Sequence, residues 1–150
     1  MRLVIDGDGS PVKGEVITLA EQFQLKVVIV TSVDHFTRKE YPTFVSFIYV
    51  DKGADRADYR IIQEIQKKDW VITQDYGLAA LVLGKGARVF HHNGQEYLQD
   101  SIDTLLTQRY LGAQIRKAGK KTKGPKPFTK ADRERFVQLM TPRIAQALAK

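Results

Sequence analysis

Aspartates recur at the ends of apolar segments in this sequence, in a pattern typical of a metal site. Four of them follow segments that we expect to be strands: Asp6, Asp8, Asp51 and Asp75. Asp55 and Asp58 are three residues apart on an expected helix, so their side chains project from one face. The carboxyl ends of parallel strands border the ligand crevice of an open sheet. Carboxylates gathered there repel one another unless a cation neutralises them, and oxygen ligands in an open site suit Mg²⁺ or Mn²⁺.

Each aspartate also has an ordinary structural explanation. An aspartate at a strand-to-helix turn often accepts hydrogen bonds from backbone donors, and this applies to Asp6, Asp8 and Asp75. Asp55, near the start of its helix, would interact favourably with the helix dipole. Asp51 is expected to be exposed rather than to bind a ligand. Together, the aspartates favour a metal site more than any one of them does. If capping were their only role, capping aspartates would have to occur by coincidence at several strand ends that the fold brings together.

The elements that would position these residues alternate between strands and helices. Short apolar, β-branched segments predict strands, and apolar residues at helical spacing predict helices. The expected strands are 2–6, 27–30, 44–50, 70–73 and 88–90, and the expected helices are 11–23, 57–65, 76–83, 98–111 and 129–148. This alternation predicts an α/β domain with βαβ units, right-handed crossovers and one parallel sheet.

Two helix starts carry specific signals, and other candidate reactive residues carry weaker ones. Ser10 before Pro11 is suited to be an N-cap, and Thr129, three residues before an aspartate, indicates a capping box. No base accompanies Ser10, so we do not expect it to be a nucleophile. Lys13, in the first turn of its helix, could reach a substrate phosphate, although an ordinary surface lysine explains it almost as well.

The three histidines give little indication of a site. His91 and His92 are adjacent, so on an extended segment they point to opposite faces, and His35 falls in a segment without clear periodicity. We expect them to pack or to face solvent.

Positive charge is concentrated near the C-terminus. Residues 1–115 contain 13 Lys and Arg against 15 Asp and Glu, whereas residues 116–150 contain 11 against 2. The segment 118–128 has two glycines and two prolines, which predicts a basic loop before the last helix. A basic segment beside an acidic body suits a phosphate backbone, and a solvated tail is the alternative.

Length and composition limit the possible classes of protein. The 150 residues predict a single domain, with an α/β core over 1–115 and the basic loop and C-terminal helix over 116–150. The absence of cysteine excludes disulfides and thiolate zinc sites. No apolar run approaches a membrane span and no secretory segment is recognisable, so we expect a cytoplasmic protein without a membrane partner.

Five segments carry the most specific pattern in the chain: 4–13 (VIDGDGSPVK), 53–58 (GADRAD), 71–79 (VITQDYGLA), 85–89 (KGARV) and 124–133 (GPKPFTKADR). Together they resemble the uncharacterised YaiI/YqxD family, which is regarded as a branch of the PIN-like nuclease superfamily. Relatives usually carry cysteine where this chain has Ser10, which argues against cysteine-based chemistry. The resemblance implies a three-layer sandwich with strand order 3-2-1-4-5 and a C-terminal helical extension. It also matches Asp6, Asp58 and Asp75 to acidic metal positions, with Asp8 and Asp55 in support.

The leading interpretation is a Mg²⁺- or Mn²⁺-dependent ribonuclease or related phosphodiesterase. Asp6, Asp75, Asp58 and Asp55 would hold the metal, and Asp8 with Asp58 would complete its shell or orient an attacking water. RNA is expected as a partner more than DNA. The residues expected to bind its backbone are Lys13, Lys117, Lys120, Lys121, Lys123, Lys126, Lys130 and Arg133.

Two alternatives remain open. The first is a non-catalytic RNA-binding module, which would keep the fold and catalyse no reaction. A phosphatase of the haloacid-dehalogenase type is suggested by the sequence from Asp6 to Ser10, which imitates that family's aspartate nucleophile and acid/base pair. The sequence does not decide between one and two metal ions, nor does it determine the oligomeric state.

Overall fold

A five-stranded parallel sheet runs through the centre of the computed structural model, which describes residues 1–53, 55–117, 119 and 127–149. Its strands are β1 (Arg2–Asp6), β2 (Lys26–Ser32), β3 (Val45–Val50), β4 (Trp70–Ile72) and β5 (Arg88–Phe90). They lie in the order β3-β2-β1-β4-β5, and every neighbouring pair is parallel. The strand order that we expected is therefore confirmed, and β1 lies where the order reverses.

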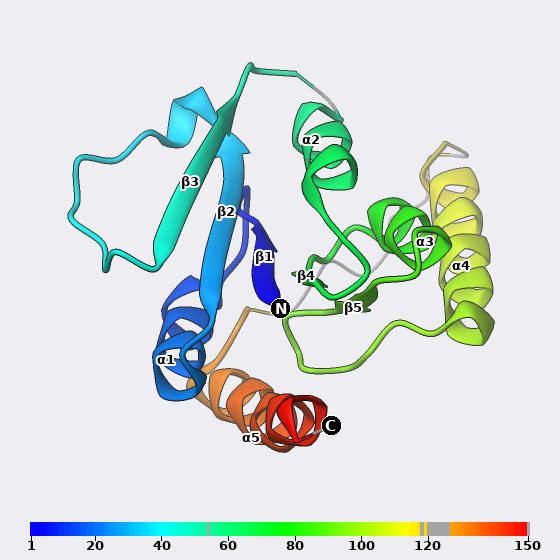
Figure 1. The fold of residues 1–150 in the computed structure, drawn as a ribbon. Helices are drawn as coiled ribbons and strands as arrows, with labels where there is room; N and C mark the ends of the chain where they lie inside the picture. The colour runs from blue at the N-terminus through cyan, green and yellow to red at the C-terminus, as the bar shows by residue number, and fades with distance from the viewer. Residues whose placement is uncertain (54, 118, 120–126, 150) are drawn as a thin grey trace.

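Helices cover both faces of the sheet (Figure 1). One face carries α1 (Lys13–Phe23) and α5 (Lys130–Leu148), and the other carries α2 (Arg56–Glu64), α3 (Tyr76–Gly84) and α4 (Gln99–Lys117). A short 3-10 helix, η1 (Val33–His35), follows β2. The result is a three-layer α/β architecture. Within the described ranges, no helix combines the length and apolarity that a membrane crossing requires.

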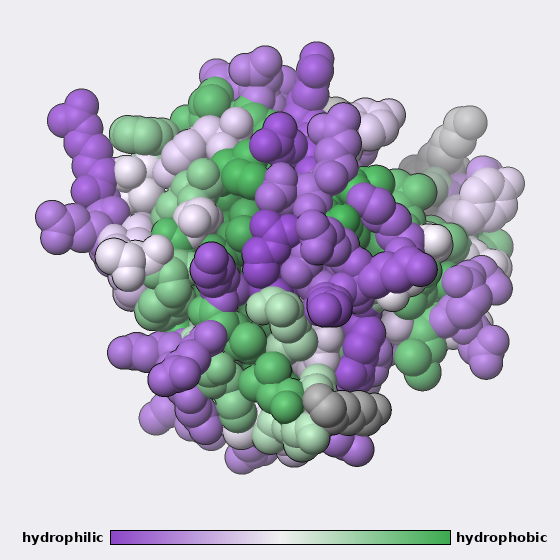
Figure 2. Space-filling view, in the orientation of Figure 1, coloured by the Kyte–Doolittle hydropathy of each residue, from purple (hydrophilic) through white to green (hydrophobic). Residues whose placement is uncertain are grey.

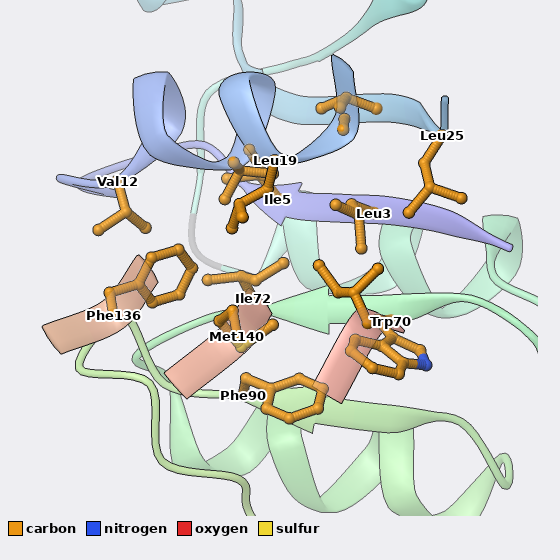
Figure 3. Packing of buried hydrophobic residues seen from close by; sticks show 14 of the residues in the cluster. Leu3, Ile5, Val12, Leu19, Leu25, Trp70, Ile72, Phe90, Phe136 and Met140 are labelled. Carbon is orange, nitrogen blue, oxygen red and sulfur yellow. The ribbon is translucent and has the colours of Figure 1, made fainter. Parts of the chain in front are cut away.

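Strand side chains alternate between two buried apolar clusters. Leu3 and Ile5 belong to the cluster beneath α1 and α5, whereas Val4 belongs to the one beneath α2, α3 and α4. A parallel sheet that is covered on both faces needs apolar residues at successive positions, as these strands have. Figure 3 shows Phe136 and Met140 of α5 against the first face. The C-terminal helix, expected as an extension after residue 115, is thus part of the core.

The predicted start of the first helix was wrong by two residues. α1 begins at Lys13 with Val12 as its N-cap, instead of beginning at Pro11 with Ser10 as its cap. Val12 is completely buried, so the chain first turns inward to place this side chain in the core. The Ser10 hydroxyl oxygen is buried without a hydrogen-bond partner among the described residues. A cysteine thiol at this position would tolerate such surroundings better, because it is a weaker hydrogen-bonding group.

The predicted start of the last helix is confirmed. The Thr129 hydroxyl accepts a hydrogen bond from the Asp132 backbone N–H at 3.1 Å, and the Asp132 carboxylate accepts one from the Thr129 N–H at 2.9 Å. This reciprocal capping box satisfies two backbone donors that have no partner within the helix.

An ion-pair cluster fixes the sheet at its amino edge. The Arg2 guanidinium contacts the Asp69 carboxylate at 2.7 Å and the Glu64 carboxylate at 2.9 Å. Burial alone would raise the pKa of Asp69, but hydrogen bonds from Arg2 and from the Gln66 backbone hold that pKa below its usual value. The cluster ties β1 to the segment before β4, at the edge opposite the carboxyl ends of the strands.

The turn after β1 approaches β2 too closely for any side chain. A Cβ at Gly7 would lie 2.8 Å from Ile29 Cγ2 and 3.0 Å from the Val30 carbonyl oxygen, which accepts the Gly7 N–H at 2.7 Å. We predict that Gly7→Ala lowers the free energy of unfolding by roughly 1–3 kcal/mol, measured by urea denaturation. The control is Gly14→Ala in α1, where nothing lies within 4 Å of the added carbon. It should be stabilising by about 0.5–1 kcal/mol. Equal stability of Gly7→Ala and the wild type would disprove this close packing.

Candidate metal centre

A pocket of about 230 Å³ opens at the carboxyl edge of the sheet. We call it the acidic pocket, because six aspartates line it: Asp6, Asp8, Asp51, Asp55, Asp58 and Asp75. They come from the ends of β1, β3 and β4 and from the start of α2. The described residues that line it include neither lysine nor arginine. Every aspartate singled out from the sequence therefore reaches this one pocket.

Asp6 is positioned by the register between β1 and β4. Ile5 pairs with Ile72, so the next residues, Asp6 and Thr73, are neighbours at the carboxyl edge. The buried Thr73 hydroxyl donates a hydrogen bond to Asp6 Oδ2 at 2.8 Å and accepts one from the Asp75 backbone N–H at 3.0 Å. Sequence reasoning did not assign a role to Thr73. Its signal was present, since it is the polar residue that directly follows the apolar segment of β4.

Asp6 lies in an environment that disfavours its charge. Burial is the largest effect on its pKa, and the hydrogen bond from Thr73 acts against it. The negative charges of Asp58, Asp75 and Asp8 then raise the pKa further, and the result is a value of about 6 instead of 3.8. A bound cation would favour the ionised form of this carboxyl, since it would offset both the burial and the repulsion.

Asp8 is held against β2 and has an imidazole beside it. The Thr31 hydroxyl and the Ser32 backbone N–H donate to Asp8 Oδ1 at 2.6 and 3.1 Å. The His35 Nε2 atom lies 3.6 Å from the same oxygen. His35 was expected in a loop without a role, but η1 brings it to the rim of the acidic pocket. No feature of the sequence around His35 indicated this approach, because it depends on how the chain turns after β2.

Asp75 caps a helix and lines the pocket as well. Its Oδ1 atom accepts hydrogen bonds from the backbone N–H groups of Gly77 and Leu78 at 2.8 and 3.2 Å. The ordinary explanation for an aspartate at this position is therefore correct. The cap also fixes the carboxyl group at the end of β4, next to Thr73 and Asp6.

Asp55 lies at the start of its helix, where the expected interaction with the helix dipole is available. It is the N-cap residue of α2, yet its side chain makes no capping hydrogen bond. Its backbone has φ 67° and ψ 4°, the left-handed region that non-glycine residues rarely adopt. Such strained positions cluster at functional sites. Asp58 lies in the first turn of the same helix, and Asp51 is exposed as expected, although it also borders the pocket.

The donors in the acidic pocket fit a hard divalent cation in type and in charge, because six carboxylates line it together with the neutral oxygen donors of Ser32 and Gln74. Within the described residues, however, no group of three or more His, Asp or Glu side chains is already arranged to hold a metal ion. Binding would therefore require carboxylates to rotate toward the ion. The pocket therefore contains suitable donor groups for a cation, but its described side chains are not already arranged around one.

The basic residues proposed to hold nucleic acid lie elsewhere or outside the described residues. Lys13 begins α1 and the exposed Lys130 begins α5, and neither lines the acidic pocket. Arg133 also lies outside its lining, because its guanidinium contacts the Glu15 carboxylate at 3.1 Å and the Pro11 carbonyl oxygen. The remaining predictions concern Lys120, Lys121, Lys123 and Lys126, which lie outside the described residues, and Lys117, of which only the backbone is described.

The fold and the pocket together define an α/β protein with a parallel sheet and an aspartate cluster where the strand order reverses. Residues 4–146 match the model of the uncharacterised YaiI/YqxD family, and the chain belongs to that family. A relative named UPF0178 protein from Enterococcus faecalis is 56% identical over 148 residues, covering 99% of this chain and 100% of the relative. Another UPF0178 protein, from Bacillus cereus, is 51% identical over 146 residues, covering 97% and 100%.

One solved structure also resembles the chain. It is a crystal structure of Rae1 (YacP) from Bacillus subtilis, with a TM-score of 0.41 and 19% sequence identity. The alignment covers 98% of this chain and 99% of that one.

Proposed function

We propose that this protein is a Mg²⁺- or Mn²⁺-dependent nuclease that cleaves phosphodiester bonds in RNA, as a branch of the PIN-like nuclease superfamily. One observation carries the proposal: six aspartates from three βα units line a single pocket, and the pKa of Asp6 is raised to about 6 there. Clustered carboxylates at a strand-order reversal are an arrangement that a catalytic divalent cation makes favourable.

The aspartates of the acidic pocket would have different roles. The ion would be held by Asp6, Asp55, Asp58 and Asp75. When bound, it would stabilise the negative charge that develops on the scissile phosphate. The Thr73 hydroxyl keeps one Asp6 oxygen oriented, and the α3 backbone keeps one Asp75 oxygen oriented. Asp8, held by Thr31 and Ser32, would accept a hydrogen bond from the attacking water.

A nucleic acid is the proposed substrate because the sequence carries a strongly basic segment. Residues 116–150 have 11 Lys and Arg against 2 Asp and Glu. Such a segment attracts a phosphate backbone through counterion release, independently of base sequence. This charge would draw a polyanion toward a pocket that repels anions until a metal ion is bound.

The experiment is to incubate the purified protein with single-stranded and structured RNA, with Mn²⁺ and with EDTA. We expect cleavage with Mn²⁺ and no cleavage with EDTA. No preassembled three-ligand group is found in the part of the chain that the structure describes, which favours a second candidate, a non-catalytic RNA-binding module. Salt-sensitive RNA binding without cleavage at any Mg²⁺ or Mn²⁺ concentration would select that module and reject the nuclease. Transfer of phosphate to Asp6 from a phosphomonoester would instead indicate the phosphatase.

A further inference from the structure

Two arginines on α2 lie at the border of the acidic pocket. Arg56 is the first residue of α2 and Arg60 follows it by four positions, so their side chains project from one face of the helix. Both are exposed, and they line a hollow of about 360 Å³ between α2 and the end of β3. We call this space the arginine hollow.

The arginine hollow adjoins the acidic pocket. Val50 and Asp51, where β3 ends, line both spaces. Gly53 lines the acidic pocket and lies beside the Arg56 side chain, because a carbon added to Gly53 would be 3.6 Å from Arg56 Cγ and 3.8 Å from Arg56 Nε. Arg56 therefore brings positive charge to the rim of a pocket whose own described lining is acidic.

The two guanidinium groups have little competition for a ligand. Within the described part of the chain, Arg56 forms no ion pair with a carboxylate. Arg60 contacts the Glu64 carboxylate only at 3.9 Å, and Arg2 holds the same carboxyl group at 2.9 Å. An exposed ion pair of this kind contributes little free energy, so an incoming anion can replace it.

The lining of the arginine hollow suits a phosphate group. Among the described residues that line it, two are cationic and Asp51 is the one carboxylate. The Tyr59 hydroxyl and the Gln63 amide of the lining can also donate hydrogen bonds. Figure 2 shows mostly hydrophilic side chains over α2. Guanidinium groups bind phosphate oxygens through paired N–H donors, which gives both strength and orientation.

We infer that the arginine hollow binds a backbone phosphate of a nucleic acid, next to the phosphodiester that occupies the acidic pocket. This inference rests on the proposed function and deepens it, because it makes the substrate a strand that continues beyond the scissile bond. A phosphomonoester has no second phosphate to place beside Arg56 and Arg60. The arginine hollow therefore favours a polynucleotide.

The test measures binding of an oligouridylate of about twelve nucleotides by fluorescence anisotropy, at several salt concentrations. Ca²⁺ is present, because it binds carboxylate oxygens and offsets the charge of the acidic pocket. We expect Arg56→Gln to weaken binding roughly fivefold and to reduce the slope of log affinity against log salt by about 0.7, since one phosphate contact is lost. Arg56→Lys keeps the charge and should restore most of that slope.

Lys26→Gln is the matched control. Lys26 is exposed and begins β2 at the amino edge of the sheet, opposite the acidic pocket, so its substitution makes the same change in net charge elsewhere. It should change the affinity by less than about twofold. Unchanged binding by Arg56→Gln would overturn the phosphate site. Equal losses in Arg56→Gln and Lys26→Gln would also overturn it, because they would reflect net charge alone.

The outcome is separable from that of the proposed function. Weaker binding by Arg56→Gln but not by Lys26→Gln, without cleavage by the wild type in Mn²⁺, would support the phosphate site and reject the nuclease. Cleavage in Mn²⁺ with unchanged binding by Arg56→Gln would support the nuclease and reject the phosphate site.

Discussion

Asp6→Asn should abolish RNA cleavage, with a loss of roughly 10³-fold or more, which corresponds to about 4 kcal/mol in the activation barrier. The substitution removes one negative charge from the centre of the acidic pocket and nearly preserves the shape of the side chain. The asparagine carbonyl oxygen can still accept the hydrogen bond that Thr73 donates to Asp6 at 2.8 Å. The loss would therefore be electrostatic and not a consequence of a disturbed fold. The measurement is the initial rate of RNA cleavage at saturating Mn²⁺.

Asp103→Asn is the matched control for this experiment. Asp103 is exposed on α4 and does not line the acidic pocket, so its substitution makes the same change in net charge elsewhere. It should retain the wild-type rate within about a factor of two. Cleavage that persists in Asp6→Asn, or that falls equally in both variants, would show that the pocket does not carry the reaction.

In the absence of metal, the acidic pocket should make the protein less stable as the pH rises from 4 to 6. The pKa of Asp6 is raised from 3.8 to about 6, so the folded protein binds this proton more tightly than the unfolded chain. Stability must then decrease with pH across this interval, and the effect is complete above pH 6. A difference of this size corresponds to about 3 kcal/mol at neutral pH. It arises because the native state holds a buried carboxylate among other carboxylates.

Urea unfolding of the wild type and of Asp6→Asn, at several pH values between 4 and 8 in EDTA, measures this effect. We expect the variant to be more stable than the wild type by about 3 kcal/mol at pH 8 and equally stable at pH 4. The difference between the two proteins is the useful quantity, because Asp69 contributes in the opposite direction in both. A difference that does not vary with pH would mean that burial and the neighbouring carboxylates do not raise the pKa of Asp6 in the folded protein.

Local patterns in the sequence were sufficient to predict the α/β class and the parallel sheet, whereas the strand order was predicted from the family resemblance. Strands such as β1 and β4 are apolar at successive positions because helices cover both faces of the sheet, and this is visible in the residue types alone. The capping box at Thr129 was also predictable, because it depends on two residues three positions apart. The start of α1 was not, because it depends on Val12 reaching the core from another element.

The residues of the acidic pocket that could be predicted are those whose place depends only on their position along their own strand. Asp6 and Asp75 follow from the polarity of β1 and β4, which a parallel sheet imposes on all strands. Thr73 and His35 were missed for different reasons. Thr73 acts through the register of β4 against β1, and His35 approaches Asp8 through the turn after β2. Asp51 was correctly expected to be exposed, and its place in the pocket depends on the arrangement of β3 beside α2.

The aromatic residues in and before β3 illustrate the same limit. Phe47 and Tyr49 could be assigned to one face of an expected strand, because side chains alternate along β3. Phe36 packs on Tyr49 and Tyr41 packs on Phe47 because of the loop between β2 and β3, whose path no periodic pattern predicts. Tertiary contacts between loops and strands therefore supply what local patterns lack.

The proposed function depends on the binding of a divalent cation by Asp6, Asp55, Asp58 and Asp75 in the acidic pocket. The most direct test is titration of the purified protein with Mn²⁺, followed by electron paramagnetic resonance of the free ion, for the wild type, Asp6→Asn and Asp103→Asn. We expect saturable binding by the wild type and by Asp103→Asn, and a loss of at least about tenfold in affinity for Asp6→Asn. Absence of saturable binding by the wild type, or equal affinity of all three proteins, would contradict it.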